Sequence, residues 1–185
     1  MTLAYDQNPA PAFPENILAE GDAEKPWRVA HTKSRREKAL AGYMAKAGIG
    51  YYLPMMKKRQ TVQKRVRYSL MPVFSGYLFF RGGDGDRHKA MRSNHIARVI
   101  PVRDQQRLIQ DLENVQKVLL QTDRVYPFDF ITEGQAVRVK KGPMKDVEGV
   151  VIKKNRNYRL VVSVNSIMQA ISVEIDADDV APMTD

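Results

Sequence analysis

Hydrophobic and polar positions follow two different patterns along the chain. In the first part, residues 27–32 are β-prone and would set Trp27, Val29 and His31 on one face against Arg28, Ala30 and Thr32 on the other, which predicts a strand. From Ala39 to Ala47, apolar residues recur at three- and four-residue spacing, as on one face of a helix. Ser34 and Glu37 have the spacing of a capping box at the start of this helix, and Gly48 is suited to close it in a left-handed conformation.

Further strands and helices follow in a recognisable order. The pattern predicts strands at residues 51–56, 73–80 and 98–102, a helix from Asp86 towards Ala97, and a helix after Asp104. The order strand, helix, strand, strand, helix, strand is that of the split βαβ, or ferredoxin-like, arrangement, with helices on one face of a sheet. We therefore expect an α+β domain over residues 26–121.

Beyond residue 131 the pattern changes to closely spaced short strands. These are predicted at residues 136–140, 147–153, 158–164 and 170–175 and around Val180, separated by turn-forming residues. A domain this small is marginal unless its sheet closes on itself, because closure removes exposed edges. We expect a small SH3-like β-barrel at residues 132–185 and a linker at residues 122–131.

The remaining segment, residues 1–25, contains three prolines among small and acidic residues and has no apolar period. This composition predicts a disordered leader. The segment also lacks the basic-then-apolar layout of a secretion signal, and no run of 18 apolar residues exists to span a bilayer. We therefore expect a cytoplasmic protein that does not bind membranes.

The composition also limits the chemistry. The chain contains no cysteine, which excludes disulfides, cysteine zinc sites, iron–sulfur clusters and thiol nucleophiles. The three histidines, His31, His88 and His95, are not accompanied by a paired-carboxylate motif. We expect no catalytic residue, no metal and no cofactor, and hence a protein that is not an enzyme.

The formal net charge is +9, and the basic residues concentrate in the middle of the chain. Six of the eleven residues from 57 to 67 are cationic, with no acid among them: Lys57, Lys58, Arg59, Lys64, Arg65 and Arg67. This density favours a nucleic-acid phosphate backbone as the partner. The alternative is a solvated hairpin that only keeps the protein soluble.

Three stretches resemble the NusG family of transcription elongation and antitermination factors. They are the opening strand at residues 27–32, Phe74–Phe80, which is similar to the family's Phe-Pro-Gly-Tyr followed by an apolar strand, and residues 134–151, which look like a KOW signature. Their order and spacing match from Pro26 to Met183. The resemblance implies a NusG amino-terminal domain at residues 26–121 and a KOW domain at residues 132–185.

The resemblance implies that Trp27, Phe74 and Tyr77 form an exposed aromatic patch that binds the clamp helices of the largest RNA polymerase subunit. The residues alone leave burial in the core as an equal alternative. The resemblance also implies that the cationic segment faces the nucleic acid of the elongation complex, either non-template DNA or nascent RNA. Three further basic residues at the start of the second helix would share this role: Arg87, Lys89 and Arg92.

Two departures from the family pattern bear on function. Ser75 replaces the usual proline, and Ser166 and Ile167 stand where the family has an Ile-Phe pair that engages Rho or a small-subunit ribosomal protein. Either partner would meet the loop formed by Ser166, Ile167 and Met168. We expect a monomeric, operon-specific paralogue that bridges the polymerase clamp and promotes antitermination and reduced pausing. The alternatives are a housekeeping NusG elongation and termination factor, or a KOW-containing RNA-binding translation or ribosomal protein.

Overall fold

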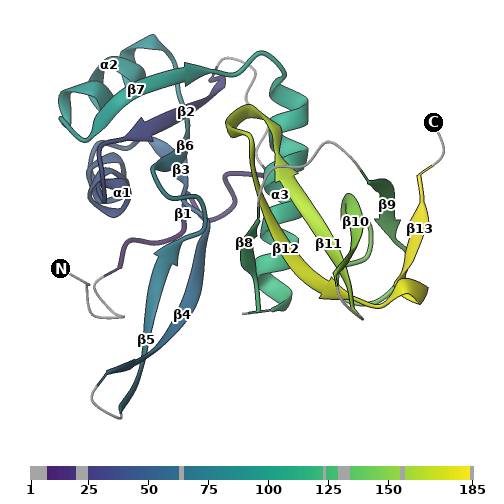
Figure 1. Ribbon diagram of the computed structural model, residues 1–185. Coiled ribbons are helices and arrows are strands. Elements are labelled where there is room, and N and C mark those ends of the chain that lie inside the picture. Colours follow the sequence, from purple (N-terminus) through teal and green to yellow (C-terminus); the bar gives the residue numbers. More distant parts are fainter. Residues whose placement is uncertain are drawn as a thin grey trace. The chain divides into compact units, whose positions relative to one another are not determined.

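The structure is a computed structural model that describes residues 8–19, 25–62, 65–122, 124–128, 134–154 and 157–183. The chain divides into two compact units, Met1–Gln105 and Gln106–Asp185 (Figure 1). This division falls inside the predicted domain of residues 26–121, at the start of the third helix. No helix among the residues described is long and apolar enough to cross a membrane.

The first unit is built on a five-stranded antiparallel sheet with the strand order β1-β3-β6-β2-β7. Its strands are β1 (Ala12–Phe13), β2 (Trp27–Thr32), β3 (Gly50–Tyr52), β6 (Tyr77–Arg81) and β7 (Ile96–Pro101). Without β1, this order is the ferredoxin-like one, in which the first and third strands along the chain lie side by side in the centre. The predicted α+β, ferredoxin-like fold is therefore confirmed.

Two helices accompany this sheet, α1 (Glu37–Lys46) and α2 (Asp84–Arg92). The buried Leu40 and Met44 of α1 belong to one core cluster with Leu78 and Phe80 of β6. Gly48 follows α1 with φ 69°, the left-handed conformation that was predicted. The α-helical spacing of apolar residues therefore placed one face of α1 correctly, because that face packs on the sheet.

The predicted capping box is wrong. The helix begins at Glu37 with Arg36 as its N-cap residue, and no side chain caps it. The Glu37 carboxylate instead accepts a hydrogen bond from the backbone N–H of Gly76, at 2.6 Å. A partner 39 residues away in the sequence thus replaces the local Ser34 cap that the spacing suggested.

The expectation of a disordered leader is wrong for residues 8–19. Strand β1 pairs antiparallel with β3, and Ile17 and Leu18 are buried. The backbone N–H of Leu53 donates to the carbonyl oxygen of Pro11 at 2.7 Å. This segment covers β3, which would otherwise be an exposed edge strand.

The basic segment forms a separate two-stranded antiparallel sheet of β4 (Met55–Val62) and β5 (Arg65–Pro72). In Figure 1 this hairpin projects from the five-stranded sheet of the same unit. The strand predicted at residues 51–56 is interrupted, because β3 ends before Pro54 and β4 begins after it. The strand predicted from Val73 begins only at Tyr77, because a turn precedes it.

The second unit contains nearly all of α3 (Gln105–Gln121) and a six-stranded antiparallel sheet, ordered β13-β9-β10-β11-β12-β8. The strands are β8 (Tyr126–Phe128), β9 (Gln135–Val139), β10 (Glu148–Lys154), β11 (Asn157–Val164), β12 (Gln169–Ile175) and β13 (Val180–Pro182). Five of these strands were predicted, and the carboxy-terminal β-domain is confirmed. In the described residues, the backbone pairing leaves β8 and β13 at the two ends of the sheet.

The predicted linker at residues 122–131 is wrong for Tyr126–Phe128. These residues form β8 and pair with β12, with Phe128 opposite Ala170. Asp123 and residues 129–133 lie outside the described residues. The mixed polar and aromatic sequence suggested a connection, but strand pairing recruits it to the edge of the sheet.

Candidate functional site

The turn that precedes β6 is held at Gly76 by two hydrogen bonds from other elements. Gly76 has φ 85°, a conformation that glycine adopts without a steric penalty. Its N–H donates to Glu37 at the start of α1, and its carbonyl oxygen accepts the N–H of Thr32 at 2.8 Å. Glu37 itself is buried. The turn is therefore fixed between α1 and the end of β2.

This turn sets the position of Tyr77. Tyr77 lies opposite His31 in the pairing of β2 with β6, and the two ring centroids are 5.2 Å apart at an angle of 55°. Both side chains are half-buried and keep part of their surface in solvent. We call these two residues the Tyr77–His31 pair.

The prediction of an exposed patch is wrong for Trp27 and Phe74. Their side chains are 3% and 1% exposed, so neither ring is available to a partner in this conformation. Phe74 packs edge-on against Phe79, with ring centroids 6.3 Å apart. Trp27 shares one face of β2 with the fully buried Val29, because side chains alternate along a strand. Of the three predicted aromatic residues, only Tyr77 reaches the surface.

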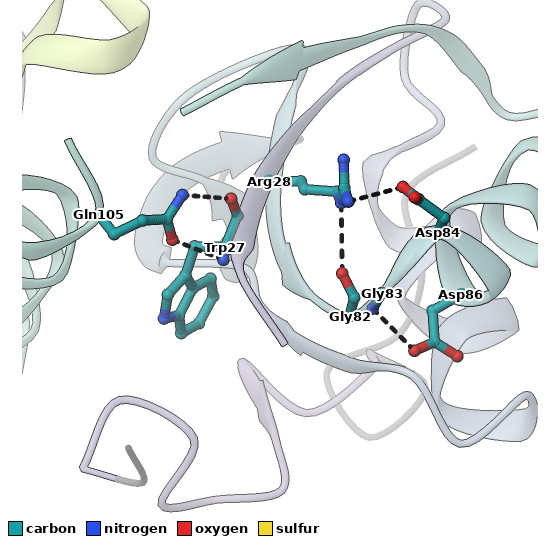
Figure 2. A network of polar contacts seen from close by, with 7 residues as sticks. All are labelled: Trp27, Arg28, Gly82, Gly83, Asp84, Asp86 and Gln105. Carbon is teal, nitrogen blue, oxygen red and sulfur yellow. Dashed lines mark hydrogen bonds and ion pairs between the residues drawn. The ribbon is translucent and has the colours of Figure 1, made fainter. Parts of the chain in front are cut away.

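The backbone of Trp27 is fixed by one side chain, as Figure 2 shows. Gln105 accepts the N–H of Trp27 at 2.7 Å through Oε1 and donates to its carbonyl oxygen at 3.0 Å through Nε2. The amide thus satisfies the N–H and the carbonyl oxygen of the first residue of β2, for which the β7 register gives no partner. The signal for Gln105 in the sequence is weak, because a glutamine at the start of a helix is commonplace.

The next residue of β2 connects to α2. Arg28 forms a salt bridge with Asp84 at 2.9 Å and donates from Nε to the carbonyl oxygen of Gly82 at 3.2 Å (Figure 2). Asp86 accepts the N–H of Gly83 at 3.2 Å. The helix therefore begins at Asp84, and Asp86 lies in its first turn instead of at the N-cap position expected from the sequence.

The basic residues predicted on α2 do lie on that helix. Arg87 is half-buried, whereas Lys89 and Arg92 are exposed. Tyr43 of α1 donates to the backbone carbonyl of Lys89 at 3.1 Å, which ties the two helices together. Two positive charges of this group are therefore presented to solvent, where phosphate contacts are possible.

The six hairpin cations are described to different extents. Lys57 and Lys58 are exposed. Lys64 lies outside the described residues, and the structure places only the backbone of Arg59, Arg65 and Arg67. The register sets Arg59 opposite Tyr68, an exposed tyrosine that the sequence analysis did not single out. The signal that could have found it is the alternation of apolar and basic positions along β5.

The base of the hairpin is anchored by Lys38 of α1. Its Nζ donates to the carbonyl oxygen of Leu70 at 2.5 Å and to Oδ1 of Asn8 at 2.6 Å. Burial lowers the pKa of Lys38, and the neighbouring Glu37 carboxylate opposes that shift. A partly desolvated ammonium group with two acceptors therefore joins α1, β5 and the amino-terminal segment.

In the second unit, the predicted partner loop follows β11. Residues Asn165–Ile167 form a single 3-10 turn, and Met168 is left-handed with φ 51°. Ile167 is buried and Ser166 is half-buried, whereas Met168 is 67% exposed. Of its three predicted residues, the loop therefore presents mainly Met168 to solvent.

A buried carboxylate on α3 holds this loop. Asp111 Oδ2 accepts hydrogen bonds from the backbone N–H and the side-chain amide of Asn165, both at 3.0 Å. Arg107 pairs with its other oxygen at 3.0 Å. Burial raises the pKa of Asp111, although Asn165 and Arg107 act in the opposite direction. One signal for this residue is visible in the sequence, a charged position next to the apolar stripe of the helix.

A family model described as "NusG: Transcription termination factor nusG" matches residues 25–130. A solved structure titled "Domain interaction in Thermotoga maritima NusG" is similar, with 15% sequence identity, 89% of this chain and 100% of that chain covered, and a TM-score of 0.46. A comparison with curated proteins gave no match. Because the family model spans more than half of the sequence, the chain belongs to the NusG family.

Proposed function

We propose that this chain binds the clamp helices of the largest RNA polymerase subunit through the Tyr77–His31 pair. As a NusG-family protein, the chain is a transcription elongation factor of a family whose members bind RNA polymerase and are not enzymes. We propose that it acts in the cytoplasm as a monomer, on particular operons, to promote antitermination and to reduce pausing. The observation that carries the proposal is the position of Tyr77, the surface ring of the family motif.

The contacts around Tyr77 support a docking role. Its turn is fixed by Glu37 and Thr32, so the ring is held in place before any partner arrives. A preorganised tyrosine costs little conformational entropy on binding, which is one reason why tyrosine is frequent among interface hot spots. Phe74, three residues before Tyr77, is buried against Phe79, so we propose that it does not contact the polymerase itself.

The proposed mechanism is mechanical. A factor that contacts both sides of the polymerase cleft makes clamp opening costly, and a paused or terminating complex needs that opening. A contact energy that differs by roughly 1.4 kcal/mol between the closed and open states shifts their ratio tenfold. The predicted result is faster and less interrupted elongation.

The exposed cations support a second contact, with the nucleic acid of the elongation complex. Lys57 and Lys58 on the hairpin and Lys89 and Arg92 on α2 are open to solvent. Contacts from lysine and arginine to phosphates position a protein without reading base sequence. We propose that these residues hold non-template DNA or nascent RNA beside the docked polymerase.

The loop after β11 is the proposed contact for Rho or a small-subunit ribosomal protein. Met168 is the side chain that such a partner would meet, because Ile167 is buried. A housekeeping NusG role would depend on this contact, whereas the operon-specific role would not. The family match lies over residues 25–130, which favours either transcription role over a ribosomal KOW protein.

Transcription through a pause site with purified polymerase tests the proposal. We expect the wild-type protein to shorten the dwell time, and Tyr77→Ala to bind polymerase at least tenfold more weakly, which is the loss typical of a central tyrosine. Tyr126→Ala, which truncates an exposed tyrosine of β8, is the matched control and should bind like wild type. Equal polymerase binding by Tyr77→Ala and wild type would disprove the proposed docking surface.

A further inference from the structure

We propose that the β4–β5 hairpin is a binding site for single-stranded nucleic acid, with the ring of Tyr68 stacking on an unpaired base. The inference rests on the proposed function, which already brings non-template DNA or nascent RNA to the hairpin, and it adds the residue whose ring recognises an unpaired base. The observations that carry it are the exposure of Tyr68, the register of the hairpin and the charge of the surrounding sequence.

Tyr68 is the most exposed aromatic side chain among the described residues, with 59% of its surface in solvent. Val66, two positions earlier on β5, is 44% exposed. Side chains two residues apart on a strand lie on the same face, so the hairpin presents an apolar strip on one face. An exposed ring next to another exposed apolar residue indicates a binding surface more often than a lone apolar residue does.

The register places basic positions beside this ring. Arg59 lies opposite Tyr68, and Lys57 lies opposite Leu70 in the next position on the same face. Lys58, between them, occupies the other face of the ribbon and is exposed, as is Lys57. In the two-stranded ladder, the basic positions 57 and 59 on β4 therefore lie opposite or diagonal to the position of Tyr68.

The charge of this region is uniform in sign. The chain contains no acidic residue between Glu37 and Asp84, an interval that includes the whole hairpin. The surface is therefore complementary to a polyanion. Lysines can pair with the phosphate groups of both single-stranded and double-stranded nucleic acid, so charge alone does not distinguish the two ligands.

The ring makes that distinction. In a duplex the faces of the bases are covered by their neighbours, whereas a single strand can offer a base face to an aromatic side chain. Stacking on tyrosine is tolerant of sequence, because every base has a π-face. An exposed tyrosine on a hairpin with a basic sequence thus fits single-stranded nucleic acid better than a duplex or an acidic protein.

The hairpin is accessible and anchored at its base. Its ladder is separate from the five-stranded sheet, and Figure 1 shows it projecting from that sheet. Lys38 bonds to Leu70, and the N–H of Val73 donates to Pro54 at 2.8 Å. Tyr68 lies further from the base of the hairpin than these anchors, where a nucleic-acid strand can reach its ring.

Fluorescence anisotropy with the full chain tests the proposal at one fixed salt concentration. The probes are labelled oligo-dT, oligo-U of equal length, a mixed-sequence duplex, and polyglutamate as a competitor. We expect either or both single strands to bind more tightly than the duplex, and Tyr68→Leu to weaken that binding about tenfold. Tyr68→Phe should retain it, and Tyr126→Leu, at an exposed tyrosine outside the hairpin, should not change it.

The salt dependence separates stacking from charge. Tyr68→Leu should leave the slope of affinity against salt unchanged, because no cation is lost. Replacement of Lys57 and Lys58 by glutamine should reduce that slope. A steeper or shallower slope in Tyr68→Leu would indicate that the substitution altered the charged surface, and would count against stacking.

A second measurement uses the wild-type protein and so does not depend on how a variant folds. Photocrosslinking to an oligonucleotide that contains 5-iodouracil, followed by peptide mapping, should label Tyr68. Labelling only elsewhere, duplex binding as tight as single-strand binding, or equal competition by polyglutamate would each overturn the proposal. The proposed polymerase contact is made by Tyr77, and none of these measurements contains polymerase. A failure of the docking proposal would therefore leave these results unchanged, and the two failures can be told apart.

Discussion

The hydrogen bond between Glu37 and Gly76 gives the sharpest test of how the proposed docking turn is built. The substitution Glu37→Ala removes a buried carboxylate that accepts the Gly76 N–H at 2.6 Å. A hydrogen bond to a charged group contributes roughly 1.5–3 kcal/mol. The acid also lies in the first turn of α1, where it interacts favourably with the helix dipole by about 0.3–1 kcal/mol.

We therefore expect Glu37→Ala to lower the free energy of unfolding by about 2–3 kcal/mol. Glu37→Gln should lose less, about 1 kcal/mol, because its amide oxygen can still accept the same N–H. The loss in Glu37→Ala should also weaken polymerase binding, since the turn that positions Tyr77 is released.

Urea unfolding followed by tryptophan fluorescence measures this loss. The chain has a single tryptophan, and the buried Trp27 lies in the first unit, so the signal reports that unit alone. Glu15→Ala is the matched control, because Glu15 is exposed in the same unit and should change stability by less than about 0.5 kcal/mol. A loss below that value for Glu37→Ala would show that the carboxylate does not support the turn.

Two further predictions concern other buried polar contacts. Gln105→Ala removes both hydrogen bonds to the backbone of Trp27 and should lower the free energy of unfolding by about 1–2 kcal/mol in the same fluorescence assay. An unchanged urea midpoint would argue against the contact. Asp111 has a pKa raised by burial, so its folded state favours the proton, and stability should fall as pH rises through that pKa. Circular dichroism of urea unfolding at several pH values from about 4 upward should show this step in wild type, whereas Asp111→Asn, which cannot titrate, should lack it.

The sequence predicted most elements whose formation depends on local pattern. The alternation in residues 27–32 placed β2 correctly, and the short strands of the second unit were found where apolar alternation and turn residues coincide. Gly48 was expected in the left-handed region and has φ 69°. These features follow from the backbone preferences of a few neighbouring residues, which a single sequence displays directly.

The same reasoning located the candidate site but misjudged its surface. The motif around Tyr77 was found, yet Trp27 and Phe74 were expected at the surface and are buried. Periodicity assigns a side chain to one face of a strand, but it does not say what covers that face. Asp111 and Tyr68 were missed for the corresponding reason, because burial and exposure arise from residues distant in the sequence.

By itself, the sequence determined the kind of each main element, the order that specifies a ferredoxin-like sheet, and the density of positive charge. The tertiary structure alone decided that residues 8–19 join the sheet, that Glu37 bonds to a distant turn instead of to a local capping box, and that Tyr77 is the one accessible ring of the motif. The physical reason is the distance along the sequence over which each interaction acts. Local backbone preferences act within a few residues, whereas burial and hydrogen-bond pairing depend on which segments meet after folding.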